Sequence, residues 1–152
     1  MAESIKNKVA IVGMGCSQFG ERWDADASDL IIEAAYEAYE DAGVEPKDIE
    51  AAWVGTFNQM TGAALSQPLK LQYKPVSRNE NACGTGTDAL RNAAFAVAAK
   101  VYDLVLVVGF EKLKDTGYGG LGEIGLPPNP VYDVGMTAPG MYALAATRYF
   151  AK

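Results

Sequence analysis

A continuous apolar run, Asp103-Leu-Val-Leu-Val-Val-Gly109, constrains the fold of this chain more than any other feature. Its residues do not alternate between apolar and polar, as they would in a strand with one face in water. A strand of this kind is buried on both faces, which is typical of a parallel sheet covered by helices on both sides. The run therefore predicts an α/β layered fold.

The chain before this run alternates between strand and helix signals. Lys8–Gly13 and Ile49–Phe57 are predicted as buried strands, because they are rich in β-branched and aromatic residues. A helix is predicted from Ser28, a good N-cap residue, to Ala42, with Gly43 as its C-cap. Further helices are predicted at 63–71 and 84–99. This order implies right-handed crossovers between parallel strands.

The segment 75–82 is expected to be extended but is polar for a core strand. We interpret it as a pairing edge at a subunit interface. After Lys112 the chain is dense in glycine and proline from 115 to 140, which is typical of a functional loop, a lid or a subdomain. A helical pattern returns at 137–150. We therefore expect a core at residues 1–112 and an incomplete loop or cap segment at 113–152.

Composition excludes several classes of function. The 152 residues carry a net charge of -6 with no cluster of Lys and Arg, which argues against nucleic acid and anionic membranes as partners. The chain has no signal peptide pattern and no apolar run long enough to span a membrane, so we expect a cytoplasmic location. Two distant cysteines and no histidine argue against a disulfide framework and a metal site. Any mechanism that needs an imidazole must obtain it from outside this chain.

Two glycine-rich stretches could carry chemistry. Gly13-Met-Gly15-Cys16-Ser-Gln-Phe-Gly20 invites comparison with the dinucleotide fingerprint, but its third glycine comes two positions late and no helix follows directly. A turn at the end of a strand is the better interpretation, with Cys16 as a small residue in it.

The second stretch is Asn81-Ala-Cys83-Gly-Thr-Gly86, in which a cysteine precedes a predicted helix. A helix N-terminus stabilises a thiolate, the reactive form of cysteine. Gly84 and Gly86 leave room for a substrate, and the first amides of the helix could bind a developing oxyanion. The alternative is a free cysteine that is simply buried in a tight turn. The residues alone leave both interpretations open.

Asn81-Ala-Cys83-Gly-Thr-Gly86-Thr-Asp-Ala-Leu90 resembles the nucleophile motif of the thiolase superfamily. The run from Asp103 with its Gly-Phe-Glu-Lys ending resembles the strand that follows it there. Lys8–Gly13 and Ala34–Asp48 are similar to the first strand and helix of the branch related to sterol-carrier-protein thiolases. The resemblance covers nearly the whole chain and implies an α-β-α half with a mixed sheet, with the C-terminal half absent.

The resemblance implies that Cys83 takes an acyl group as a thioester, with Gly84 and Gly86 at the turn and the oxyanion. Gly135 and Met136 would lie in the substrate loop. The activity would be thiolytic cleavage or Claisen condensation of 3-oxoacyl-CoA, with coenzyme A as co-substrate and no tightly bound cofactor. The base would come from a C-terminal half on the same or another chain, so that this chain alone would be inactive.

The resemblance also implies partners and alternatives. The partners would be acyl-CoA, a second copy paired through 76–81 and, as in some relatives, a small zinc-containing protein that helps to accept acyl-CoA. Gly-Thr-Gly after the cysteine departs from the more usual Ala-Ser-Gly and leaves the substrate open. A retro-aldolase acting on an acyl-CoA side chain is one alternative. A non-catalytic module that binds acyl-CoA or lipid is another.

Overall fold

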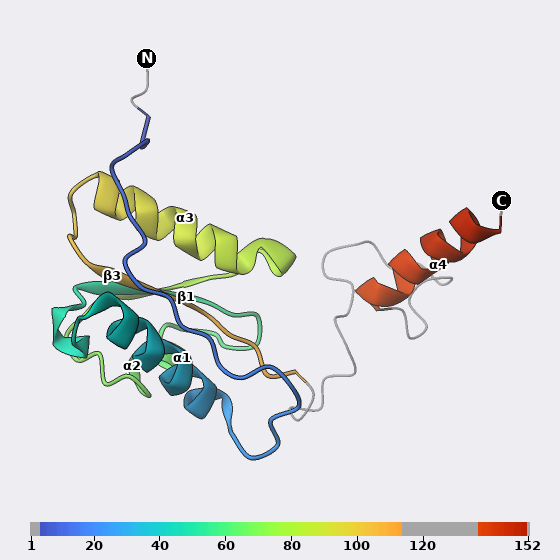
Figure 1. Ribbon diagram of the computed structural model, residues 1–152, viewed down its shortest axis with the longest axis horizontal. Coiled ribbons are helices and arrows are strands. Elements are labelled where there is room, and N and C mark those ends of the chain that lie inside the picture. The colour runs from blue at the N-terminus through green and yellow to red at the C-terminus, as the bar shows by residue number, and fades with distance from the viewer. Residues whose placement is uncertain (1–3, 114–136, 152) are drawn as a thin grey trace. The chain divides into compact units, whose positions relative to one another are not determined.

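The computed structural model describes residues 4–113 and 137–151. The chain divides into two compact units, Met1–Glu111 and Lys112–Lys152. The first unit is a three-stranded sheet with helices on both faces, and this arrangement confirms the predicted α/β class (Figure 1). In the second unit the structure describes one helix, α4 at Ala138–Phe150, which the helical pattern at 137–150 predicts.

The sheet contains β1 at Ala51–Gly55, β2 at Val76–Asn79 and β3 at Val105–Gly109, in the order β2-β1-β3. Both pairings are parallel, so the mixed sheet that the resemblance implies is not seen among the described residues. The central strand is β1, and four of its five residues are buried. The apolar run that predicts a buried strand forms β3, which is less buried because β1 is its one strand neighbour in the described chain.

Helix α1, Ala27–Ala42, covers one face of the sheet. Its N-cap is Asp26 and not Ser28, so the predicted cap is wrong by two residues. The Asp26 carboxylate accepts the amides of Ser28 and Asp29 at 2.7 and 3.0 Å, and the Asp29 carboxylate accepts the Asp26 amide at 2.9 Å. This reciprocal capping box satisfies more amides than a serine could. Gly43 ends the helix with φ 66°, as predicted.

Helix α3, Thr85–Ala98, covers the opposite face, and its Ala89 and Ala93 are fully buried. The short helix α2, Ala63–Ser66, lies on the same side of the sheet as α1 (Figure 1). The main core forms between the sheet and the layer of α1 and α2. It includes Ile31, Tyr39, Val54, Leu65, Leu106 and Val108.

The predicted strand at Lys8–Gly13 is not a strand in this structure. The segment crosses the first unit as an extended trace between the α1 and α3 sides (Figure 1). The end of the segment and the residues after it pack closely on α1: a Cβ on Gly13 would lie 2.5 Å from the Ala38 carbonyl oxygen, and one on Gly15 would lie 2.1 Å from that of Ala34. Directly after the segment, three alternate amides donate to three α1 carboxylates one helical turn apart, in the pairs Met14–Asp41, Cys16–Glu37 and Gln18–Glu33. In the described chain no strand pairs with residues 8–13, and α1 holds the residues that follow them.

None of the helices in the described ranges 4–113 and 137–151 has the length and apolar character needed to cross a membrane.

Candidate functional site

The candidate site lies where the parallel strands end. Gly55 and Gly109 are register partners at the carboxyl ends of β1 and β3. The start of α3 lies against both: a Cβ on Gly55 would be 3.0 Å from Thr85 Cγ2, and one on Gly109 would be 4.0 Å from Gly86 Cα. The turn that precedes α3 is therefore fixed at the edge of the sheet where open α/β folds bind their ligands.

Cys83 occupies this turn. It lies in the 3-10 turn Ala82–Gly84, which leads directly into α3, and its thiol is free and exposed. The described residues therefore do not bury Cys83. Ala82 has φ 45°, in the left-handed region that non-glycine residues rarely adopt. Such a conformation costs free energy, and backbone strain of this kind clusters at functional sites.

Hydrogen bonds hold the turn in this conformation. The Thr85 hydroxyl accepts the Asn81 amide at 2.7 Å and donates to the Ala82 carbonyl at 2.7 Å. The Glu80 carboxylate accepts the Ala82 amide at 2.6 Å. The residue before the cysteine is thus bonded through both of its backbone groups, so the backbone that leads into Cys83 is held in place.

The two glycines after the cysteine differ in their surroundings. The Gly84 amide donates to the Asn81 carbonyl at 2.9 Å, so this amide is engaged within the turn. Gly84 is also the N-cap of α3 and has no side chain with which to cap the first turn. A Cβ on Gly86 would meet nothing within 4 Å, so the site is open at this position. The assignment of both glycines to an oxyanion site stays a prediction.

The loop after β1 is held by two charged residues that the sequence analysis did not assign to the site. The Glu111 carboxylate accepts the amides of Phe57 and Asn58 at 2.7 and 3.2 Å, with the Thr56 hydroxyl at 3.4 Å. The Arg78 guanidinium donates to the Thr56 and Phe57 carbonyls, the shortest bond being 2.8 Å. Glu111 lies two residues after the end of β3, and Arg78 lies on β2. The sequence signal for Glu111 is an ionisable residue close to the end of a strand. That Glu111 and Arg78 hold the same loop can be seen only in the fold.

Asp88 in the first turn of α3 was also missed. Its carboxylate accepts the side-chain amide of Asn79 at 3.1 Å and pairs with Arg91. This contact ties the end of β2 to α3 beside the Cys83 turn. An acidic residue in the first turn also complements the helix dipole.

The second cysteine has a different environment. The Cys16 amide donates to Glu37 and its thiol contacts the Ser17 carbonyl at 3.4 Å. The thiol is free and exposed like that of Cys83, but no helix begins beside it. Cys16 is therefore a matched control for Cys83.

The predicted substrate-loop residues Gly135 and Met136 lie outside the described residues. In the part of the chain that the structure describes, no group of His, Cys, Asp and Glu has an arrangement that could hold a metal ion.

A family model and several known proteins that are similar to this chain indicate the same family. Residues 9–124 match the family described as "Thiolase, N-terminal domain". An acetyl-CoA acetyltransferase of Methanocaldococcus jannaschii is 35% identical over 93% of this chain, and one of Methanothermobacter thermautotrophicus is 33% identical over 93%. The bovine sterol carrier protein 2 is 32% identical over 72%. The chain spans only 38% and 39% of the two acetyltransferases and 21% of the bovine protein.

Solved structures give the same picture of the fold. The Ltp2-ChsH2(DUF35) aldolase superposes on 61% of this chain with a TM-score of 0.54 and 26% identity. An acetyl-CoA acetyltransferase from Syntrophomonas wolfei superposes on 60% with a TM-score of 0.53 and 24% identity, which speaks for the fold alone. This chain covers 25% and 26% of those two chains.

Proposed function

This chain belongs to the thiolase family through its N-terminal domain, and on that premise we propose that it supplies the acyl-accepting cysteine of an acyltransferase that acts on acyl-CoA. The observation that carries the proposal is the placement of Cys83. Its free, exposed thiol follows a left-handed alanine and precedes α3 at the carboxyl edge of a parallel sheet. A nucleophile needs this combination of access and a held backbone.

The proposed reaction has two halves. In the first, the Cys83 sulfur attacks the carbonyl carbon of an acyl-CoA thioester, a C–S bond forms, and the bond to the coenzyme A sulfur breaks with loss of the coenzyme A thiolate. The Gly84 amide already donates to the Asn81 carbonyl, so the backbone at Gly86, where the site is open, would stabilise the oxyanion of the tetrahedral intermediate. In the second half, the α-carbon of a second acyl-CoA, deprotonated by a base, attacks the new thioester and releases Cys83. Thiolytic cleavage is the reverse.

The base in this scheme comes from another polypeptide or from a further part of the same one. The 152 residues contain no histidine, the residue most often used as a general base near neutral pH. The two archaeal acetyltransferases have more than twice the length that this chain matches. We therefore propose that acyl transfer needs the additional polypeptide that these relatives carry.

A retro-aldolase is the second candidate. It is favoured by the superposition on the Ltp2-ChsH2(DUF35) aldolase, the structural relative described above with the higher TM-score. That aldolase combines Ltp2 with ChsH2(DUF35), and we propose that a small zinc-containing protein that helps to accept acyl-CoA is a partner of this chain. In the aldolase case carbon–carbon cleavage would proceed without an acyl-cysteine.

The proposed second copy of the chain would pair along β2. Val76–Asn79 has β1 as its one strand neighbour among the described residues, so its other edge is free for another strand. Light scattering of the purified protein would show a dimer, and a folded monomer at micromolar concentration would contradict this part of the proposal.

The two cysteines provide the experiment. The chain is purified together with the polypeptide that supplies the base, as the parent protein, Cys83→Ala and Cys16→Ala. Thiolysis of acetoacetyl-CoA is followed by the loss of its absorbance. We expect Cys83→Ala to lose at least about a thousandfold in rate, as for loss of a covalent nucleophile, and Cys16→Ala to retain it. Equal rates for the two variants would contradict the proposal.

A further inference from the structure

The left-handed residue of the Cys83 turn is an alanine, although two glycines lie beside it. Ala82 has φ 45°, whereas Gly84 has φ -91° and Gly86 lies within α3. A glycine adopts a positive φ without steric cost, but an alanine does not. Lys100 takes a similar conformation directly after the C-cap of α3, where left-handed residues are common. Ala82 precedes a helix, so the end of a helix does not account for its conformation.

Hydrogen bonds to both backbone groups hold Ala82 in this conformation. The Glu80 carboxylate accepts its amide at 2.6 Å. Its carbonyl accepts the Thr85 hydroxyl at 2.7 Å and also the Thr85 amide. A strained backbone conformation persists only where its surroundings over-determine it. Of these three bonds, the one from Glu80 has a charged acceptor, and such bonds are the stronger kind.

The Glu80 side chain makes no second hydrogen bond in the part of the chain that the structure describes. It is exposed, and its carboxylate bonds to the Ala82 amide alone. Thr85, in contrast, also lies against the end of β1, because a Cβ on Gly55 would be 3.0 Å from its Cγ2. Substitution of Glu80 therefore changes the turn alone, whereas substitution of Thr85 also changes the packing on the sheet.

We propose that Glu80 is a positioning residue for the Cys83 nucleophile, because its carboxylate keeps the preceding alanine left-handed and limits the turn to one backbone conformation. A glycine at position 82 would adopt this conformation without help and would leave it as easily. The alanine loses a charge-assisted bond when it leaves. A reacting group that is held before the substrate arrives reacts faster, and small displacements lower the rate. The proposal rests on the proposed function for the role of Cys83 as the nucleophile.

Hydrogen exchange of the Gly84 amide tests the turn in the full 152-residue chain, without acyl-CoA. This amide donates to the Asn81 carbonyl at 2.9 Å, across Ala82 and Cys83, so it exchanges when the turn opens. We expect Glu80→Ala to raise its exchange rate, measured by NMR, at least about tenfold. Glu80→Gln retains an acceptor oxygen at the same reach and should stay within about threefold of the parent chain.

The substitution Ala82→Gly supplies the matched background. Because glycine takes a positive φ without steric cost, the turn should form there without the carboxylate. We therefore expect Glu80→Ala to change the Gly84 exchange rate less than about threefold in the Ala82→Gly chain. An effect of the Glu80 charge alone, or of overall stability, would be equal in the two backgrounds.

The same variants, purified with the polypeptide that supplies the base, connect the turn to the reaction. Thiolysis of acetoacetyl-CoA gives kcat/KM for each. We expect Glu80→Ala to lower kcat/KM at least about tenfold, because the nucleophile is displaced. Glu80→Gln should restore it to within about threefold of the parent value, and so should Ala82→Gly in the presence of Glu80→Ala.

Several results would overturn the proposal. They are an unchanged Gly84 exchange rate in Glu80→Ala, an equal effect of this substitution in both backgrounds, and a Glu80→Gln chain as impaired as Glu80→Ala. Faster exchange with an unchanged kcat/KM would also overturn it, since the carboxylate would then hold the turn without positioning the nucleophile. Absence of thiolysis in the parent complex would contradict the proposed function, and the exchange rates would still confirm or refute the bond from Glu80.

Discussion

Replacing Gly55 by alanine tests whether the end of β1 positions the Cys83 turn. The new methyl group would lie 3.0 Å from Thr85 Cγ2 and 3.3 Å from the Thr85 carbonyl oxygen, both closer than ordinary van der Waals contact. The Thr85 side chain cannot rotate away without cost, because its hydroxyl bonds both the Asn81 amide and the Ala82 carbonyl. The steric strain of the added methyl group therefore falls on the backbone of the turn Ala82–Gly84.

The size of the effect follows from these contacts. Insertion of a methyl group into a packed site costs about 1–3 kcal/mol. Rotation of Thr85 instead would lose two hydrogen bonds of about 1 kcal/mol each. Either route lowers the free energy of unfolding by about 1–3 kcal/mol, which moves the urea midpoint down by about 1 M for a domain of this size.

Gly109→Ala is the matched control, because Gly109 is the register partner of Gly55 on β3. Its Cβ would meet Gly86 Cα at 4.0 Å, an ordinary contact. We expect this variant to change stability by no more than about 0.5–1 kcal/mol, and in the stabilising direction, since alanine restricts the unfolded chain. Urea unfolding followed by far-UV circular dichroism measures both variants.

The rate of alkylation of Cys83 by iodoacetamide, with Cys16 as internal reference, reports on the turn in the same samples. Gly55→Ala should change the Cys83 rate and leave the Cys16 rate constant. If Gly55→Ala is as stable as Gly109→Ala and the Cys83 rate is unaltered, the contact between β1 and the start of α3 does not position the turn.

Three further substitutions have expected outcomes. Glu111→Gln should lower the free energy of unfolding by about 1–3 kcal/mol in urea titrations, because two amides lose a charged acceptor. Asp26→Ala should cost about 0.5–2 kcal/mol in the same assay and Ser28→Ala much less, since Asp26 is the N-cap; the reverse order would contradict the capping box. The Gln18 amide lowers the pKa of Glu33, so this carboxylate stabilises the fold above its unfolded pKa and loses that effect as the pH falls through its folded value. Glu33→Gln should therefore flatten the loss of stability below about pH 4, and an unchanged acid limb would refute this.

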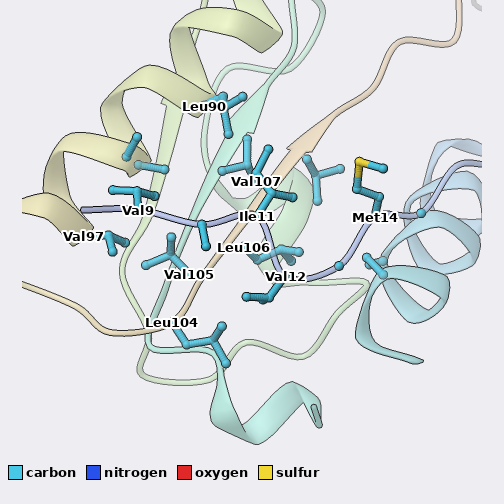
Figure 2. A pocket seen from close by; sticks show the side chains of 18 of the residues that line it. Val9, Ile11, Val12, Met14, Leu90, Val97, Leu104, Val105, Leu106 and Val107 are labelled. Carbon is cyan, nitrogen blue, oxygen red and sulfur yellow. The ribbon is translucent and has the colours of Figure 1, made fainter. Parts of the chain in front are cut away.

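Much of the architecture could be predicted because local signals and tertiary structure agree. The β-branched run at 103–109 and the helix before Gly43 both form where their patterns indicate. The segment Lys8–Gly13 also has a strand pattern, but it does not form a strand. A strand is defined by its neighbour, and the space beside this segment is an apolar groove that residues of β3 and α3 also line (Figure 2). Residue patterns report the preference for an extended backbone and cannot report whether a partner is present.

The candidate site shows the same division. Cys83 could be found from the glycines and the helix that follow it, because those signals are local. Thr85, Arg78 and Glu111 could not be assigned, because their roles depend on contacts between residues far apart in sequence, such as the 54 positions between Glu111 and Phe57. The left-handed conformation of Ala82 could not be predicted either, since an alanine in the sequence does not indicate a positive φ.

Mass spectrometry of the acylated enzyme tests the central claim most directly. The chain, purified with the polypeptide that supplies the base, is mixed with ¹⁴C-acetyl-CoA, quenched in acid and digested, and the peptides that contain Cys83 and Cys16 are separated. The account predicts an acetyl thioester on Cys83 in the parent protein and in Cys16→Ala, and no label in Cys83→Ala. Carbon–carbon cleavage that proceeds while Cys83 stays unlabelled would contradict it and favour the aldolase.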